Sequence, residues 1–539
     1  LVRGRVRPEH ENPLNRGLIN AYQPILNTAL AWPRTVLVVA ALLLIVSLLP
    51  FSKLGSEFMP ELDEGDLLYM PTTYPALSIG EAQELLQVTD RLIKSVPEVH
   101  RVFGKIGRAE TATDPAPLTM IETTIQLKPR DEWREGMTLE RLKQELDRRV
   151  QLPGLSNAWV QPIKTRIDML ATGIKTPVGV KVSGPDLHVI EGITRNIEAT
   201  LRDVPGTRSA FAERIVGGRY IDIDIQREAA ARLGLNIADI QDVVSTAVGG
   251  MDIGETVEGL ERYPINIRYP ASYRDSLAAL EELPIVTPQG ATIPLAQVAD
   301  IRITDGPDMI RSENARPAGW IYVDIRDRDL GSYVEDAQAR VAATTTLPPG
   351  YSIAWAGQYQ YLERATERLS LLVPGVLALI VLLLYLNFRR ASDVLIVLAG
   401  LPLALTGGIW LLWLLDYDLS VAAWVGFIAL AGVAAETVVI MLVYLNNAWR
   451  ATSEKTLSSL HDAVMEGAVR RVRPKMMTVL TIIAGLLPIM IGSGTGSEVM
   501  RRIAAPMIGG MVTATLLTLI LVPVMFHLWH GHLLKKGIV

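Results

Sequence analysis

The sequence contains no cysteine and only seven histidines among its 539 residues. The absence of cysteine excludes disulfide bonds and every thiolate metal site. Four histidines are scattered along the chain, which argues against a zinc site. The other three lie together near the end of the chain, where such a cluster suits an interfacial tail as well as a ligand set. In chain order the histidines are His10, His100, His188, His461, His527, His530 and His532. No phosphate-binding glycine loop, nucleotide motif or nucleophile-base arrangement is present, so the sequence supports neither an ATP-driven pump nor an enzyme.

The chain also lacks a strong charge of either sign, since its formal net charge is −5. A nucleic-acid partner would require a concentrated basic surface, so this class of function is excluded. Apolar sequence is abundant, with 49% hydrophobic residues and a positive mean hydropathy. This composition and length indicate a membrane protein with a large soluble part. The chain begins at Leu1 with an Arg-rich polar segment and no initiator methionine, so we expect a fragment.

Six apolar runs are long enough to be transmembrane helices. The first spans residues 35–53, and the stretch that follows it has no comparable uncharged run until about residue 368. The other five span residues 369–388, 394–415, 419–445, 476–491 and 503–526. We therefore predict one membrane span, a large extramembrane domain and then a bundle of five spans, with lipid on the outside of the bundle.

Basic residues in the short loops predict the orientation of these spans, because Lys and Arg concentrate on the cytoplasmic side. The N-terminal arm, Arg389 and Arg390, the 450–475 segment, and Lys535 and Lys536 all fall on one side, with Arg501 and Arg502 as the exception. The domain between the first and second spans then lies outside the cytoplasm. For a bacterial inner membrane this compartment is the periplasm.

One span carries a carboxylate, Glu436, near its centre. A charged side chain at the bilayer midplane costs roughly 2.5–3.5 kcal/mol on insertion scales, and such residues face a bundle interior, find a partner or relay protons. Val425, Ala429 and Gly432 share the face of Glu436 at helical spacing, and these mostly small residues allow another helix to approach. The alternative is a hydrogen-bonded glutamate with a structural role only.

The extramembrane domain has the alternation of strands and helices expected of repeated split β-α-β units. We predict an α+β fold with two such porter subdomains, and a β-rich docking subdomain inserted into the second. Segments 207–212 and 220–225 are predicted to pair within the second unit. The predicted division of the chain is a cytoplasmic arm at 1–34, a span at 35–53, the first porter subdomain at 54–177, the second at 178–227 and 314–360, the docking subdomain at 228–313, and the five-helix bundle with a short cytoplasmic tail at 361–539.

Four motifs in the same order carry a family resemblance. They are Gly55-Ser-Glu-Phe-Met-Pro-Glu-Leu-Asp-Glu-Gly-Asp-Leu-Leu-Tyr-Met-Pro71, Arg166-Ile-Asp-Met-Leu-Ala-Thr-Gly-Ile-Lys175, Gly432-Val-Ala-Ala-Glu436 and Arg471-Val-Arg-Pro-Lys475. With the layout of the spans, they resemble the C-terminal half of a heavy-metal resistance-nodulation-division (RND) exporter, of the Cus-type copper/silver subgroup. The match covers essentially the whole chain.

This resemblance implies a proton-driven secondary transporter of Cu(I) and Ag(I) without a cofactor. It implies a homotrimer in the bacterial inner membrane that binds a periplasmic adaptor and an outer-membrane channel. The first half of such a pump, with its intramembrane Asp, is expected to be missing. Glu436 and Lys475 match the proton relay of the family, although Lys475 is equally placed to be an interfacial lysine that obeys the charge rule.

Three methionines match the metal site of the subgroup: Met70, Met120 and Met169. Methionine usually fills gaps in cores, but a neutral thioether suits Cu(I) or Ag(I) and is a poor ligand for Zn(II). Glu122 lies two residues after Met120 and would share its face in a strand, where it would supply a carboxylate. We expect Met169 to lie in a flexible segment for which Gly173 acts as a hinge.

Four further residues are expected on the path of the metal. Three match positions of the family, although each is also explained as a solvated charge, and the fourth is a methionine that equally suits packing or contact with lipid. They are Glu64, Asp114, Lys175 and Met500. Two rival functions stay open. An exporter of Zn, Co, Ni or drugs would require carboxylate or histidine ligands or an aromatic pocket, and a non-transporting membrane scaffold would require no soft-metal ligands.

Overall fold

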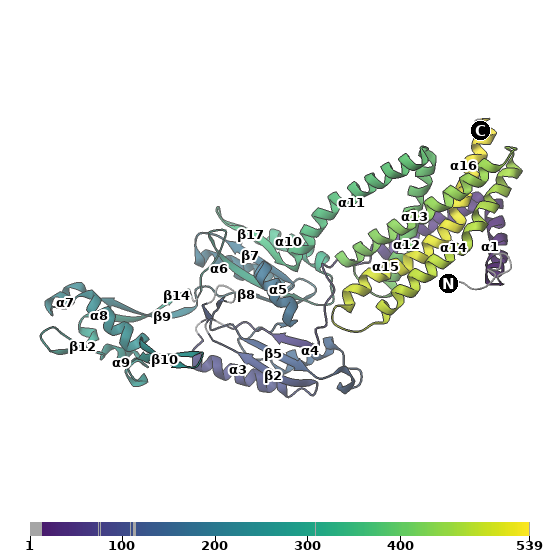
Figure 1. Cartoon of the computed structure of the whole chain (residues 1–539). Helices are drawn as coiled ribbons and strands as arrows, with labels where there is room; N and C mark the ends of the chain where they lie inside the picture. The colour runs from purple at the N-terminus through teal and green to yellow at the C-terminus, as the bar shows by residue number, and fades with distance from the viewer. Residues whose placement is uncertain are drawn as a thin grey trace.

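The computed structural model describes residues 13–73, 75, 77–107, 109–110, 115–307 and 309–537. Figure 1 shows three regions in a row, which are a helical bundle that contains both ends of the described chain, a middle region of helices and sheets, and a small lobe at the far end. Among the described residues, six helices are long and apolar enough to cross a membrane.

The bundle is formed by the beginning and the end of the chain. Its helices are α1 (Pro13–Ala31), α2 (Pro33–Phe51), α11 (Gln358–Phe388), α12 (Ala391–Leu414), α13 (Val421–Ala451), α14 (Leu457–Ile491), α15 (Ser497–Leu516) and α16 (Val522–Lys535), the last two joined by a π-helical turn at Leu517–Leu521. Several extend beyond the predicted apolar runs. The expected polar arm is in part wrong, because α1 buries Leu26 in the core of the bundle and the Tyr22 hydroxyl donates to the Leu519 carbonyl at 2.6 Å.

Small residues allow helices α12 and α15 to pack closely. A Cβ atom placed on Gly407 would lie 2.2 Å from the carbonyl oxygen of Gly509, and a Cβ on Gly509 would lie 2.2 Å from the carbonyl oxygen of Gly407. The Thr513 hydroxyl donates across the same contact to the Ala404 carbonyl at 2.8 Å. Such close packing of backbones is typical of helices that associate within membranes.

The first porter subdomain is a four-stranded antiparallel sheet covered by two helices. Its strands, in spatial order, are β2 (Val99–Lys105), β5 (Glu122–Leu127), β1 (Asp66–Tyr69) and β6 (Trp159–Val160), and its helices are α3 (Ile79–Lys94) and α4 (Leu139–Arg149). A short pair, β3 (Ala109–Glu110) and β4 (Pro115–Ala116), lies apart from this sheet. Leu67 and Ile125 pair in the register and are buried beneath the helices.

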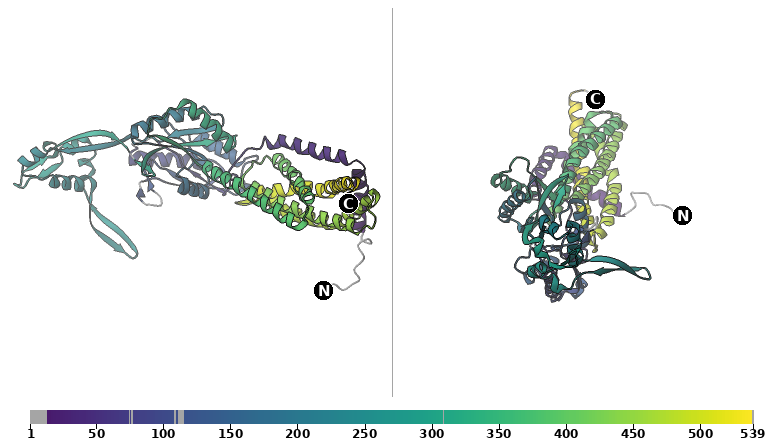
Figure 2. Two further views of the ribbon diagram at one scale, coloured as in Figure 1. Left: turned by 90° about the horizontal axis from the view of Figure 1, so that it is seen from above. Right: turned by 90° about the vertical axis from the view of Figure 1, so that its left-hand side faces the viewer.

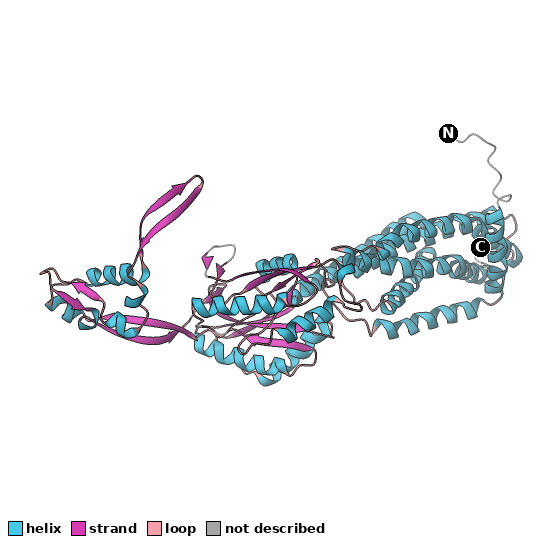
Figure 3. Ribbon diagram, turned by 90° about the horizontal axis from the view of Figure 1, so that it is seen from below, coloured by secondary structure: helices cyan, strands magenta, loops and turns pink. Residues whose placement is uncertain are grey.

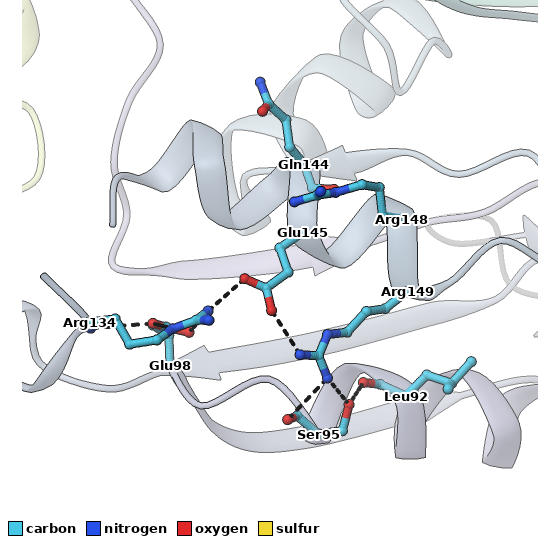
Figure 4. A network of polar contacts seen from close by, with 8 residues as sticks. All are labelled: Leu92, Ser95, Glu98, Arg134, Gln144, Glu145, Arg148 and Arg149. Carbon is cyan, nitrogen blue, oxygen red and sulfur yellow. Dashed lines mark hydrogen bonds and ion pairs between the residues drawn. The ribbon is translucent and has the colours of Figure 1, made fainter. Parts of the chain in front are cut away.

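An ionic network ties helix α4 to the start of strand β2 (Figure 4). Arg134 bonds the buried Glu98 carboxylate through Nε at 2.6 Å and Glu145 through Nη2 at 2.6 Å. Arg149 in turn bonds Glu145 at 2.9 Å and the Ser95 hydroxyl at 2.9 Å. The hydrogen bonds from Arg134 hold the pKa of Glu98 below its ordinary value, as expected for a buried carboxylate with a charged partner. This network is structural, because every charge in it is matched.

The second porter subdomain is a five-stranded antiparallel sheet. Its strands are β15 (Arg311–Glu313), β16 (Arg316–Ile325), β7 (Val178–Ser183), β17 (Ser352–Gly357) and β8 (Thr207–Ala212), the last paired with β16. Helices α6 (Leu187–Arg202) and α10 (Leu330–Thr344) bury its apolar residues in a core of their own.

The lobe joins the second subdomain through two paired strands. They are β9 (Gly218–Ile225) and β14 (Ala299–Gly306), and their pairing corrects the predicted partnership of 220–225 with 207–212. The lobe itself contains α7 (Arg227–Arg232), α8 (Ile237–Val244), α9 (Leu277–Glu281), and the pair β12 (Pro284–Val286) and β13 (Thr292–Pro294). A hairpin of β10 (Met251–Glu258) and β11 (Glu261–Ile267) projects from it, as Figures 2 and 3 show from two sides.

A short segment after α2 connects the bundle to the porter region, and we call residues 55–58 the junction segment. Ser56 forms a parallel bridge with Leu419 in the α12–α13 loop, and its carbonyl accepts the amide of Gly331 at the start of α10 at 3.2 Å. Glu57 of this segment accepts a bond from Arg502 of α15 at 3.1 Å. The segment therefore contacts two membrane elements and one porter helix at once.

Candidate metal site

A cavity of about 290 Å³ lies between the two porter subdomains, and all three predicted methionines line it. Met70 directly follows β1 and is 1% exposed, with its amide donating to the Ala158 carbonyl at 2.9 Å. Met120 precedes β5 and is held by a bridge to Thr72. Met169 comes from α5 (Pro162–Thr172). Three separate segments therefore bring thioethers to one space.

The position of Met169 corrects the expected flexible segment. The residue lies in the last turn of a regular helix, and the Gly173 amide caps that turn by donating to the Met169 carbonyl at 2.8 Å. Gly173 has a φ of +79°, and a Cβ there would lie 2.4 Å from the ring of Trp320. Glycine is required at this position by the left-handed backbone and by the contact with Trp320. Gly173 thus caps helix α5 and allows the end of this helix to pack against Trp320 of the second subdomain.

The opposite wall of the cavity belongs to the second subdomain and was not predicted. Its polar members form a matched set, in which Glu213 accepts the Tyr322 hydroxyl at 2.7 Å and Arg311 Nε at 3.0 Å. The guanidinium of Arg311 also lies 4.3 Å from the centre of the Trp320 ring. This carboxylate is therefore neutralised by its own neighbours. No local motif marks these residues, because they meet the methionines only through the packing of two subdomains.

Lys175 lines the methionine cavity and also a second cavity of about 400 Å³. Its ammonium donates to the Met70 carbonyl at 2.9 Å and to the Thr72 hydroxyl at 2.7 Å. Burial lowers the pKa of Lys175 to about 8, against the opposing effect of Glu213. The side chain thus separates the two cavities and fixes the backbone beside Met70.

Glu122 is not among the described residues that line the cavity. Its Oε2 atom lies 2.6 Å from Lys105 Nζ and 3.5 Å from Arg166 Nη2, while its buried Oε1 accepts no hydrogen bond from any residue that the structure describes. Arg166 itself lines the cavity. The carboxylate is therefore engaged by two cations behind the methionines, and the predicted direct ligand role of Glu122 has no support in this arrangement.

The predicted relay residues lie on neighbouring helices of the bundle. Lys475 on α14 is 5% exposed, its Nζ atom forms no hydrogen bond within the described part of the chain, and the charge of Glu436 acts on it. Glu436 on α13 is exposed in this chain, and so is Gly432 one turn before it. A Cβ added to Gly432 would meet no atom within 4 Å. The face predicted to receive another helix is therefore open.

A family model described as "AcrB/AcrD/AcrF family" matches residues 1–530. The chain belongs to the AcrB/AcrD/AcrF family. The cation efflux system protein CusA of Escherichia coli (strain K12) is 56% identical over 99% of this chain and 52% of that protein. The putative cation efflux system protein SilA of Salmonella typhimurium is 56% identical over 98% of this chain and 51% of that protein.

More distant relatives of this AcrB/AcrD/AcrF family member are named for particular metals. The cobalt-zinc-cadmium resistance protein CzcA of Cupriavidus metallidurans is 37% identical over 97% of this chain and 49% of that protein. A crystal structure of a heavy metal efflux pump matches with a TM-score of 0.86 at 31% identity, over 96% of this chain and 53% of that one. The chain spans about half the length of the curated relatives it matches.

These comparisons confirm the predicted resemblance to Cus-type RND heavy-metal pumps. The fold is an RND porter fold of mixed helix and sheet with apolar helical segments. The family member is a multi-pass protein of the inner membrane.

Two predicted path residues of this family member, Glu64 and Met500, are not among the described residues that line the methionine cavity. Both carboxylate oxygens of Glu64 accept backbone amides of the first turn of α5, from Ile163 at 2.6 Å and Lys164 at 2.8 Å. Glu64 thus caps the helix that carries Met169, which is a structural role that sequence reasoning missed. Met500 lies near the start of α15 and is exposed. Asp114 lies outside the described residues.

Proposed function

We propose that this chain takes part in proton-driven export of Cu(I) and Ag(I) by an RND efflux pump of the inner membrane. The observation that carries the proposal is the cavity lined by Met70, Met120 and Met169. Thioethers are soft, uncharged ligands that suit monovalent coinage metals and need no deprotonation. The metal is cargo, so the proposed mechanism requires no resident cofactor.

The polar groups of the cavity disfavour the rival substrates. A divalent borderline cation would require carboxylate or imidazole ligands, but the Glu213 carboxylate is already bonded to Arg311 and Tyr322. The volume of about 290 Å³ lies just below the range of roughly 300–1,000 Å³ for ligand pockets. The relatives named for cobalt, zinc and cadmium are also more distant than those named for cation efflux, at 37% against 56% identity.

The source of energy in this proposal is a proton gradient, with Glu436 and Lys475 as the relay. Their positions on the two packed helices α13 and α14 support an exchange of one proton within the bundle. The open face of Glu436 suits a further helix that would complete the relay. By analogy with the family we propose a homotrimer that binds a periplasmic adaptor and an outer-membrane channel.

Substitution of each methionine by isoleucine tests the metal site, because isoleucine keeps the apolar bulk and removes the sulfur. Competition with a chromophoric chelator should show Cu(I) and Ag(I) affinity falling at least tenfold for each of Met70→Ile, Met120→Ile and Met169→Ile. Met137→Ile is the matched control, since Met137 packs against the core of the first subdomain outside the cavity. Cu(I) binding that is unchanged in all three variants, or stronger binding of Zn(II), would overturn the assignment.

Substitution of Glu436 by glutamine tests the proton relay separately. In proteoliposomes, metal-dependent proton flux through the pump should be lost in Glu436→Gln while its thermal midpoint is retained. Glu466→Gln is the matched control, because Glu466 lies on α14 and forms an exposed pair with Arg470 at 2.5 Å. Undiminished flux in Glu436→Gln would reject the relay without affecting the metal assignment.

A further inference from the structure

Three buried polar side chains from three helices lie at one end of the bundle, and we call Asp393, Asn446 and His530 the Asp393 cluster. Asp393 is in the first turn of α12 and 2% exposed, Asn446 is on α13, and His530 is on α16 and 3% exposed. The surrounding core is apolar and includes Val394 and Leu445. A carboxylate in such a core is costly, so its presence requires a structural or chemical reason.

The hydrogen bonds of Asp393 are incomplete. Its Oδ2 atom accepts a bond from Asn446 Nδ2 at 3.3 Å, and its Oδ1 atom is buried and has no hydrogen-bond partner among the residues that the structure describes. A buried ionised carboxylate ordinarily has charged or multiple hydrogen-bond partners. An acceptor oxygen left open in a core is a site at which a proton can be bound, since protonation removes the buried charge.

His530 supplies a second proton acceptor at this end of the bundle, where its ring contacts Trp449, which lies one turn after Asn446 on α13. Its Nδ1 atom lies 3.1 Å from the Phe526 carbonyl, so Nδ1 carries the hydrogen in the neutral ring and Nε2 keeps its lone pair. The ring stacks on Phe526 with centroids 3.9 Å apart.

Other ionisable groups lie on the neighbouring helices and the α13–α14 loop. Lys455, between α13 and α14, bonds the carbonyl of Trp449 and lies 4.2 Å from the centre of its ring, and this ring contacts His530 edge to face. His461 on α14 and His527 on α16 form an edge-to-face pair one turn away. Helix α13 contributes Asn446 to the cluster, and this side chain is polar but uncharged.

We propose that Asp393 and His530 form a proton-binding station between the Glu436 relay and the cytoplasm. Asn446 follows Glu436 by ten residues on α13, which places the station about 15 Å along the same helix. A proton that leaves the relay binds Asp393 Oδ1, passes to His530 Nε2 to give an imidazolium, and is released to the cytoplasm. This inference rests on the proposed proton coupling, and Asp393 would act as a relay residue beyond those matched by the family motifs.

The alternative is a purely structural aspartate. An acid in the first turn of a helix is stabilised by the helix dipole, typically by 0.3–1 kcal/mol, and does not need to change its protonation. A titration that reports on the carboxyl group itself therefore separates the two roles.

Infrared difference spectroscopy of the purified chain during a pH titration supplies this readout. The parent should show a buried carboxyl C=O band that appears as the pH falls, and Asp393→Asn, which keeps the bulk and the Asn446 contact, should lose it. Asp416→Asn is the matched control, because Asp416 lies exposed in the α12–α13 loop. A titrating band that is the same in Asp393→Asn and in the parent overturns the station.

Proton flux in proteoliposomes adds the functional readout. Metal-dependent flux should fall at least tenfold in Asp393→Asn and in His530→Gln, and loss of the band with undiminished flux would overturn a role in transport. Should the parent show no proton flux, the proposed coupling fails, while the band still reports whether Asp393 binds a proton. If Asp393→Asn does not fold, His530→Gln decides, because it should shift the titration of the band and an unchanged titration would refute the pairing.

Discussion

Replacement of Gly407 by alanine should separate helices α12 and α15. The new Cβ atom would lie 2.2 Å from the Gly509 carbonyl oxygen and 2.7 Å from the Thr513 hydroxyl. The first of these neighbours is backbone and cannot rotate away, so the helices must move apart by roughly 1 Å to restore van der Waals contact. That movement also weakens the bond from Thr513 to the Ala404 carbonyl.

The expected magnitude follows from three terms. Overpacking of a tight contact costs about 1–3 kcal/mol. Loss of an interhelical hydrogen bond in a membrane costs about 0.6 kcal/mol. The higher helix propensity of alanine returns up to about 1 kcal/mol. Gly407→Ala should therefore lower the free energy of unfolding by about 1–3 kcal/mol.

The assay is thermal unfolding of the purified chain in detergent, followed by tryptophan fluorescence. Trp410 reports locally, because it lies one turn after Gly407 on α12 and its Nε1 donates to the Ser47 hydroxyl at 2.9 Å. Gly375→Ala on α11 is the matched control, since a Cβ there meets no atom within 4 Å. A midpoint for Gly407→Ala equal to or above that of Gly375→Ala would refute the reasoning.

Three further predictions concern the junction segment and the helix that carries Met169. Burial raises the pKa of Glu57 from 4.5 to about 7 despite the Arg502 pair, so the stability that the protonated carboxyl contributes is complete below pH 4.5 and is lost as the pH rises to about 7. Glu57→Gln should flatten that part of the midpoint-against-pH curve, and parallel curves would contradict this. Glu64→Gln should remove charged acceptors from the first turn of α5 and lower stability by about 1 kcal/mol in chemical denaturation, whereas an unchanged midpoint would exclude a capping role. Gly173→Ala should force Trp320 aside and weaken Cu(I) binding severalfold in the chelator assay, and unaltered affinity would show that this contact does not shape the cavity.

The positions of the apolar helices could be predicted, because a segment that lies within a bilayer must be apolar along its length. The full lengths of these helices could not be predicted. Helix α11 begins at Gln358, eleven residues before the predicted apolar run starts at Leu369. Outside the bilayer a helix continues through Glu363 and Arg364 at no cost, so an uncharged run marks only the membrane-buried part. A strand was predicted over 220–225, where β9 lies, but its partner β14 follows the whole lobe in the sequence and has no local signal.

The convergence of the three methionines on one cavity could be predicted from the family resemblance, but the residues that hold them in place could not. Helix α5 carried signals that were overlooked, since Pro162 stands at its first position and Gly173 just after its end. Those two residues mark a helix where a flexible segment was expected. The wall formed by Glu213 and Arg311 meets the methionines only in three dimensions, and neither residue lies within a recognisable motif.

The junction segment has a mechanical consequence. Its backbone is bonded to the α12–α13 loop by Leu419 and to porter helix α10 by Gly331, with no intervening linker. A displacement of the start of α13 is therefore transmitted directly to the start of α10 through the hydrogen bonds of the junction segment. Insertion of a single residue into this segment would allow the bundle and the porter region to move independently, while the fold of each would stay intact.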